Sequence, residues 1–203
     1  MDSAKHATSA LPVLEGTSRA QEDSRVDLER LVVVVRGFHA LAWRTLRRCG
    51  VSDSRVDEAV SRVFDVVSRR LGVIEEGREA AFVVQTSVRV ASEFRRAEKR
   101  RTRFERPMMT DDDAVSLAPS PEDALAESRA RALLDAVLDT LAEDVRAVFV
   151  LHELEGWTAA AIAEALSIPP GTAASRLRRA RQQFEEEAAR VRKRLATTNG
   201  DFR

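Results

Sequence analysis

Cysteine, histidine and tyrosine are scarce or absent in this chain of 203 residues, which contains one cysteine, three histidines and no tyrosine. The single Cys49 cannot form an intramolecular disulfide, and the scattered His6, His39 and His152 lack the spacing of a structural zinc site. The chain also has no phosphate-binding loop, no nucleophile motif and no paired ligand spacing. We therefore expect no enzyme activity, no metal or other cofactor, and no small-molecule substrate.

Long hydrophobic runs are missing as well, since the longest covers residues 31–35 and a membrane helix needs about 20 apolar residues. Residues 1–25 mix acidic, basic and hydroxyl side chains without the apolar segment of a signal peptide. We expect no membrane insertion, a cytoplasmic location and a disordered leader over residues 1–25. No segment alternates with the period of two that is typical of a half-buried strand, so the expected fold class is all-α.

Charged residues are segregated along the chain, although the 33 basic and 33 acidic side chains cancel in number. Residues 95–106 contain seven basic and two acidic side chains, and residues 176–194 contain eight and three, a net charge of +5 in each segment. Residues 111–127 contain six acidic side chains and no basic one, beside several prolines. Proline and like charges together are typical of a linker. The predicted layout is a leader over 1–25, a helical domain over 26–103, a flexible acidic linker over 104–124, a second helical domain over 125–195 and a tail over 196–203.

Apolar residues recur every three or four positions through both predicted domains, which is the period of an amphipathic helix. In the first domain the pattern covers residues 28–46, 56–71 and 82–94. It predicts three helices, of which the last continues into the arginine-rich segment. In the second domain, a proline–proline–glycine break separates a short helix over 158–166 from a long one over 172–189.

A short helix, a turn of about four residues and an arginine-rich second helix are typical of a helix-turn-helix, whose second helix enters the DNA major groove. Ile162 and Leu166 are expected to pack against Ala173 and Leu177. This packing directs four residues outward: Thr172, Ser175, Arg176 and Arg179. Arginine contacts guanine edges or phosphates, and a hydroxyl at a helix N-terminus suits a phosphate. The alternative is an ordinary helical hairpin with a solvated basic face.

Three segments of the second domain form a longer pattern around this hairpin. They read LAEDVRAVF at residues 141–149, EGWT at 155–158 and GTAASRLRRAR at 171–181. This pattern resembles region 4 of bacterial RNA polymerase sigma factors of the extracytoplasmic-function group, in which the last segment usually reads Gly-Thr-Val-Lys-Ser-Arg-Leu-x-Arg-Ala-Arg.

The first domain resembles region 2 of the same family. VDEAVSRVF at residues 56–64 is similar to the family run Ala-Glu-Asp-Leu-Val-Gln-Glu-Val-Phe. Residues 82–84 stand where the family has Trp-Leu-Tyr, and residues 93–96 where it has Asp-x-x-Arg. The two resemblances cover roughly residues 28–103 and 125–189 in the family's order, and the short linker leaves no room for the middle domain of larger sigma factors.

The resemblance implies a transcription initiation subunit whose region 2 binds core RNA polymerase and opens the minus-10 element, while region 4 reads the minus-35 element. The implied partners are core RNA polymerase, double-stranded and melted promoter DNA, and a possible anti-sigma factor. The implied polymerase contact comprises Asp57, Glu58, Ser61, Arg62 and Phe64. The implied minus-10 residues are Phe82, Arg89, Phe94, Arg95, Arg96, Lys99 and Arg100. The implied minus-35 residues are Thr172, Ser175, Arg176, Arg178, Arg179 and Arg181.

An arginine-rich helix beside aromatic rings suits phosphates and unstacked bases. Phe82 and Phe94 are nevertheless each explained more simply as core residues. The chain also departs from the family pattern, because Ser61 replaces a usual Gln and Ala174 a usual Lys. Since the hydroxyl and arginine residues of the second helix are retained, we expect divergent promoter specificity.

Two other functions fit parts of the sequence. A stand-alone helix-turn-helix regulator would bind an operator as a dimer, but residues 28–103 would then have no explanation. A degenerate sigma-like protein would bind polymerase or an anti-sigma factor without recognising promoters, which the alanine replacements allow. The acidic linker has two explanations: an extended spacer, or a polyanion that occupies the RNA path of the polymerase.

Overall fold

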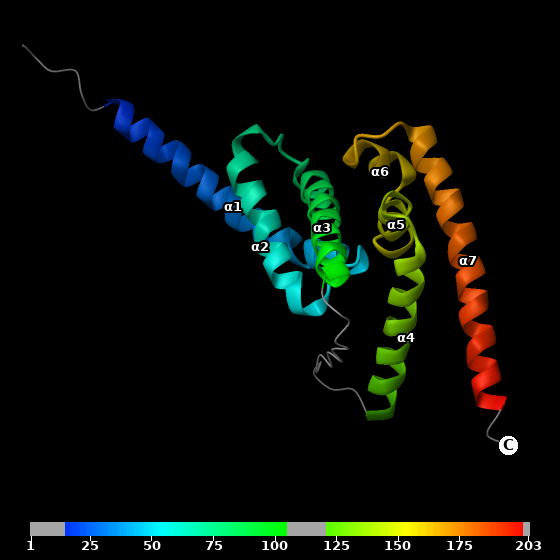
Figure 1. Cartoon of the computed structure of the whole chain (residues 1–203). Coiled ribbons are helices and arrows are strands. Elements are labelled where there is room, and N and C mark those ends of the chain that lie inside the picture. Colours follow the sequence, from blue (N-terminus) through cyan, green and yellow to red (C-terminus); the bar gives the residue numbers. More distant parts are fainter. Residues whose placement is uncertain (1–14, 105–120, 201–203) are drawn as a thin grey trace, which may run out of the picture.

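The computed structural model describes residues 15–104 and 121–200, and these residues are helical with short connecting turns (Figure 1). Within these two ranges the chain forms seven α-helices, a 3₁₀ turn and a π-helical turn, and no strand. The expected all-α fold class is confirmed. None of the described helices is both long and apolar enough to cross a membrane.

The N-terminal domain consists of α1 (Glu15–Arg48), α2 (Asp53–Arg70) and α3 (Glu79–Phe104), and each of these helices contacts the other two. They correspond to the three helices that the apolar spacing predicts. The core between them is built mainly from valine and alanine side chains on the inner faces, with one leucine: Val34, Ala42, Leu46, Val56, Ala59, Val60, Val63, Val67, Val83, Val90 and Ala91.

Arg30 fastens α1 to the connection between α2 and α3. Its guanidinium donates hydrogen bonds to the carbonyls of Leu71 and Ile74, and it lies 2.7 Å from the Glu79 carboxylate. The hydrogen bond from Arg30 holds the pKa of Glu79 below its usual value. One side chain therefore satisfies backbone carbonyls of a turn and an acid at the start of α3.

The helices extend beyond the predicted domain boundaries. Helix α1 begins at Glu15, so residues 15–25 of the predicted leader are helical, while residues 1–14 lie outside the described part. Residues 15–25 contain no proline, and adding residues to an existing helix is much easier than starting one. Most of the predicted linker also lies outside the described residues, but its last four residues are already helical.

The C-terminal domain contains α4 (Pro121–Thr140), α5 (Glu143–Phe149), α6 (Ala159–Ala165) and α7 (Pro170–Gly200). Helices α4 and α7 lie side by side, and α5 and α6 pack against α7 (Figure 1). Because α7 continues to Gly200, most of the predicted tail over 196–203 continues that helix.

A π-helical turn, Val150–Leu154, follows α5 directly. The backbone N–H of Glu155 donates to the carbonyl of Val150 at 3.1 Å, which is the five-residue spacing of a π-turn. Gly156 ends this segment with a φ of 73°, in the left-handed region that favours glycine.

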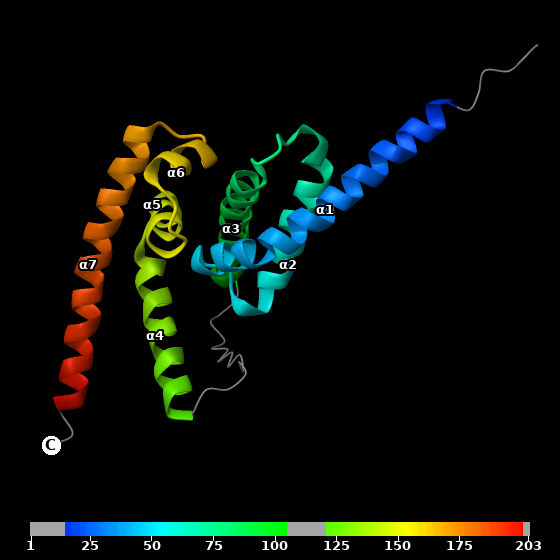
Figure 2. The same ribbon diagram turned by 180° about the vertical axis from the view of Figure 1, so that it is seen from behind.

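The two domains are docked against each other, with α3 and the end of α1 facing α5 and α6 (Figure 2). Their apolar cores are continuous, since Leu138, Val145 and Phe149 belong to the same cluster as the N-terminal core. A second cluster joins Val84 of α3 to C-terminal residues that include Ile162. The charge pattern predicts two domains joined by a linker, and in the structure these two domains pack directly against each other.

Gly50 forms the turn between α1 and α2 at this junction, with a φ of +95°. A Cβ atom there would lie 2.9 Å from Nη1 of Arg146 and 3.1 Å from Cδ of Arg95. Both the backbone conformation and the contact with the other domain therefore favour glycine.

We expect Gly50→Ala to lower the free energy of unfolding by about 1–2 kcal/mol, because alanine strains a left-handed backbone. Gly37→Ala is the matched control, since Gly37 is in the middle of α1 with no atom within 4 Å of the added Cβ. It should raise stability by about 0.5–1 kcal/mol. Chemical denaturation of both variants measures the difference, and equal effects would contradict the prediction.

Candidate nucleic-acid interface

Helices α6 and α7 form the predicted helix-turn-helix. Thr158 caps α6, because its Oγ1 accepts a hydrogen bond of 3.2 Å from the backbone N–H of Ala161. Ile162 and Leu177 are buried in one apolar cluster, against which Leu166 packs, and Ala173 is fully buried. Pro170 occupies the first position of α7, where its missing N–H costs no hydrogen bond. The expected packing between the two helices is confirmed.

The outward face of α7 carries several of the residues predicted to contact the minus-35 element. Ser175, Arg178 and Arg179 are exposed, and Thr172 is half-buried. Within the described residues, Arg178 and Arg179 have no hydrogen-bond or ion-pair partner, so their guanidinium groups are available to an incoming phosphate or base edge.

Arg176 and Arg181 differ from this expectation, because each is bound to an acid of its own domain. Arg176 lies on the side of α7 that faces α5, where its Nε is 3.0 Å from Oδ2 of Asp144, and its side chain is 29% exposed. Arg181 lies 2.7 Å from Glu153. Arg176 was predicted to point outward, but its side chain is only partly exposed, because it pairs with an acid in the first turn of α5 that the prediction did not take into account.

Helix α3 carries the residues predicted for the minus-10 element. Arg89, Arg96, Lys99 and Arg100 are exposed, and Arg95 is half-buried. Arg89 is within 3.5 Å of Glu93 on the same helix, while Arg96 reaches Glu143 of α5 at 3.9 Å. These cations form a basic surface that α5 partly covers.

Phe82 and Phe94 of α3 belong to the core. Phe94 is 4% exposed, and the guanidinium carbon of Arg55 lies 4.4 Å from the centroid of its ring. Phe82 is half-buried and packs against the same core. Phe94 therefore offers no free face to a nucleotide in this structure, in agreement with its interpretation as a core residue.

Helix α2 presents the residues predicted to contact polymerase. Asp57, Glu58, Ser61 and Arg62 are exposed, and the Ser61 hydroxyl donates to the Asp57 carbonyl at 2.9 Å. Arg62 pairs with Glu93 of α3 at 3.1 Å. Phe64 is half-buried, and its ring stacks on His39 with the centroids 6.2 Å apart. The four polar residues share one accessible surface, whereas Phe64 supports it from the core.

A cavity of about 540 Å³ lies between the domains. Its lining brings together cationic residues from both of the predicted DNA-binding helices, with acids among them. These residues are Arg89, Arg95, Arg96, Arg176, Glu93, Glu143 and Asp144. The first three belong to α3 and the fourth to α7, so the two predicted DNA-binding surfaces share one cavity.

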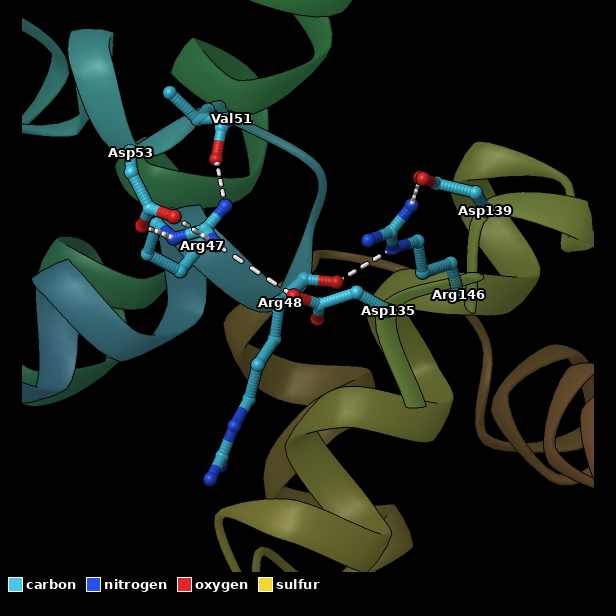
Figure 3. Close-up of polar contacts among 7 residues, drawn as sticks. All are labelled: Arg47, Arg48, Val51, Asp53, Asp135, Asp139 and Arg146. Atoms are coloured by element: carbon cyan, nitrogen blue, oxygen red, sulfur yellow. Dashed lines mark hydrogen bonds and ion pairs between the residues drawn. The ribbon is translucent and has the colours of Figure 1, made fainter. Parts of the chain in front are cut away.

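Arg146 of α5 reaches across the domain boundary (Figure 3). Its side chain is 2% exposed, its Nε donates to the backbone carbonyl of Arg48, and its Nη1 pairs with Asp139. Arg48 is the last residue of α1, so the guanidinium satisfies a carbonyl at a helix C-terminus, where cations are favoured. Beside it, Arg47 pairs with Asp53 and lies 3.5 Å from Asp135 of α4 (Figure 3).

Glu155 makes a second contact between the domains, in which the C-terminal domain provides the acid and α1 the arginines. Its carboxylate is 3% exposed and lies 2.8 Å from Arg44 and 2.7 Å from Arg48, both on α1. The hydrogen bond to Glu155 raises the pKa of Arg44. The π-turn that precedes Glu155 brings this acid against α1.

The sequence interpretation assigned no role to Arg146, Glu155, Arg44 or Arg48. Arg146 and Glu155 are in the two shorter segments of the region 4 pattern, and Arg146 is the largest fully buried side chain among the described residues. The contacts that Arg146 and Glu155 make with α1 join residues 98 to 111 positions apart, so local spacing contains no signal of these contacts.

Comparison with known proteins gives one family match and one related sequence. Residues 131–184 match the family model described as sigma-70, region 4. A segment of 72 residues is 39% identical to the ECF RNA polymerase sigma factor SigE of Mycolicibacterium smegmatis. This segment is 36% of the present chain and spans only 28% of that relative.

Two solved structures have a similar fold. The structure of CnrH in complex with the cytosolic domain of CnrY has a TM-score of 0.56 at 18% identity and covers 78% of this chain and 87% of that one. The sigma factor RpoE from Bartonella quintana, in complex with the anti-sigma factor NepR, has a TM-score of 0.55 at 16% identity and covers 78% and 94%. At this level of identity, the similarity concerns the fold.

We expect Arg146→Met to lower the free energy of unfolding by about 1–3 kcal/mol, because methionine keeps most of the volume but removes the donor of the part-buried hydrogen bond to the Arg48 carbonyl. Arg69→Met removes an equal charge from an exposed pair within α2 and should cost less than about 1 kcal/mol. Urea denaturation distinguishes the two. A cost at Arg146 no greater than that at Arg69 would show that the interdomain hydrogen bond is unimportant.

Proposed function

We propose that this chain, a sigma factor of the extracytoplasmic-function group, binds core RNA polymerase and directs promoter-specific initiation of transcription. In this proposal the N-terminal domain contacts the polymerase and opens the minus-10 element, and α7 reads the minus-35 element. A sigma factor acts as a binding subunit and not as an enzyme, so its function resides in these surfaces. The proposed location is the cytoplasm, where a bacterial polymerase works.

The observation that carries this proposal is the helix-turn-helix within the region 4 match. Its second helix presents Arg178 and Arg179, which have no partner among the residues that the structure describes, beside the exposed Ser175. A stand-alone regulator would need only this unit. The N-terminal domain, with the fold similarity across 78% of the chain, supports a sigma factor instead.

An anti-sigma factor is part of the proposal as a partner. The two similar structures are complexes, one with the cytosolic domain of CnrY and the other with the anti-sigma factor NepR. By analogy, a protein of this kind would bind the present chain and prevent its assembly with polymerase.

The direct experiment is run-off transcription with purified core RNA polymerase on a library of genomic promoter fragments. The proposal predicts discrete transcripts that require the full chain and share an upstream motif. DNA binding without transcripts would favour the stand-alone regulator, and polymerase binding without transcripts would favour a degenerate sigma-like protein.

We expect Arg179→Ala to weaken binding to the selected minus-35 sequence by about 1–3 kcal/mol, with relaxed specificity at one base pair if the guanidinium contacts a base. Arg190→Ala is the control, because Arg190 is on the same helix but lies three turns further along and pairs with Glu187. Fluorescence anisotropy with matched and mutated duplexes measures both. Equal binding by the two variants would exclude Arg179 as a reader.

We expect Asp57→Arg to reduce the affinity for core polymerase at least about tenfold, as reversing a charge within an interface costs several kcal/mol. Glu76→Arg makes the same charge change at an exposed position in the turn before α3. Competition binding against an unlabelled wild-type chain provides the measurement. The α2 surface is the wrong assignment if both variants compete equally well.

A further inference from the structure

We propose that the outward face of α1 is a self-association surface, on which a second copy of this chain pairs with the first through an antiparallel helix contact centred between Val32 and Val33. The proposal is independent of the proposed function, because it uses only the exposed face of one helix. The partner is a second copy because the charges on this face are complementary to those of the same helix running in the opposite direction.

Exposed apolar side chains are concentrated on α1. Among the described residues, six large hydrophobic side chains are exposed, and four of them are on this helix: Leu28, Val32, Val33 and Trp43. Val33 is 69% exposed, whereas the next residue, Val34, is 3% exposed and belongs to the core. Single exposed apolar residues are common on protein surfaces, but several on one helix indicate an interaction surface.

The N-terminal part of α1 extends away from the other helices (Figures 1 and 2). Gly37, further along the same helix, has no atom within 4 Å of an added Cβ, so the space beside it is open as well. Most of the stability of a helix in a protein comes from the packing of its apolar face against a neighbour. A second copy lying along α1 would provide such a neighbour.

Four exposed residues share one face of α1 at the three- and four-residue spacing of a helix: Glu29, Val32, Val33 and Arg36. This face points away from the side of α1 that carries Val34 and packs on the core. A partner on this face would therefore leave the contacts of α1 with α2 and α3 intact.

The order of the four residues is symmetric, because Glu29 is three positions before Val32 and Arg36 is three positions after Val33. When two copies of α1 run antiparallel and meet between residues 32 and 33, each valine contacts the same valine of the second copy. Glu29 of each copy then faces Arg36 of the other. Two ion pairs flank an apolar centre, which is how charged residues at the edge of a helix pair fix its orientation.

The parallel arrangement is disfavoured by the same residues. It would place Glu29 against Glu29 and Arg36 against Arg36, and like charges that face each other across an interface oppose association. A contact of one helix from each copy is small beside the roughly 1,600 Å² of a standard interface, so we expect a weak dimer with a dissociation constant in the micromolar range.

Sedimentation of the full chain over a range of micromolar concentrations measures the association. Val33→Lys should raise the dissociation constant of the dimer at least about tenfold, because it removes an apolar contact and places two like charges beside the symmetry axis. Val73→Lys is the matched control, since Val73 is 76% exposed and lies outside α1. It should leave the dissociation constant unchanged.

A charge exchange tests the antiparallel register. Glu29→Arg and Arg36→Glu should each weaken the dimer, because each variant places like charges opposite one another in both flanking pairs. When the two variants are mixed, the heterodimer has an acid opposite an arginine on both sides, so the mixture should associate at least about tenfold more tightly than either variant alone. Glu76→Arg, an exposed change outside α1, should neither weaken the dimer nor associate more tightly when mixed with Arg36→Glu.

Circular dichroism shows whether each variant is folded, and a variant that misfolds cannot restore association in the mixture. Three results would each overturn the proposal: a chain that is monomeric at every concentration, a dimer that Val33→Lys does not weaken, or a mixture that associates no more tightly than its two components.

Discussion

The buried guanidinium of Arg146 connects the two domains at the point where α1 ends. It donates to the Arg48 carbonyl, and the Gly50 turn leaves room for it, so the end of one helix depends on a side chain from the other domain. Burying a charge is costly unless it is paired and hydrogen-bonded, and Arg146 meets both conditions through Asp139 and the carbonyl. The relative position of α3 and α7 follows from this junction.

In the docked arrangement, the two predicted DNA-binding surfaces each have an arginine that pairs with an acid of the same short helix, α5. Arg176 and Arg96 belong to different domains and different predicted DNA elements, yet both are bound to acids at the start of α5. Arg178 and Arg179 remain available on the outer face of α7. These four arginines therefore form two sets: Arg178 and Arg179 are exposed on α7, whereas Arg96 and Arg176 pair with acids of α5.

Local pattern was sufficient to predict the helices and the helix-turn-helix. The Thr158 cap, the proline at the start of α7 and the Ile162–Leu177 packing all depend on residues within twenty positions of one another. The domain interface could not be predicted in this way, because its hydrogen bonds join residues that lie between 51 and 111 positions apart. The π-turn before Glu155 was also missed, since no simple residue pattern announces a five-residue spacing.

The central claim is that the two domains are docked in the free chain, and a distance measurement between them tests it most directly. Ser68 of α2 and Ala189 of α7 are exposed positions in different domains, and both can carry spin labels in a Cys49→Ala background. Pulsed dipolar spectroscopy should give one narrow distance distribution at the separation of the docked domains. A broad distribution that extends to longer distances would contradict the account, because it would mean that the domains move independently in the free protein.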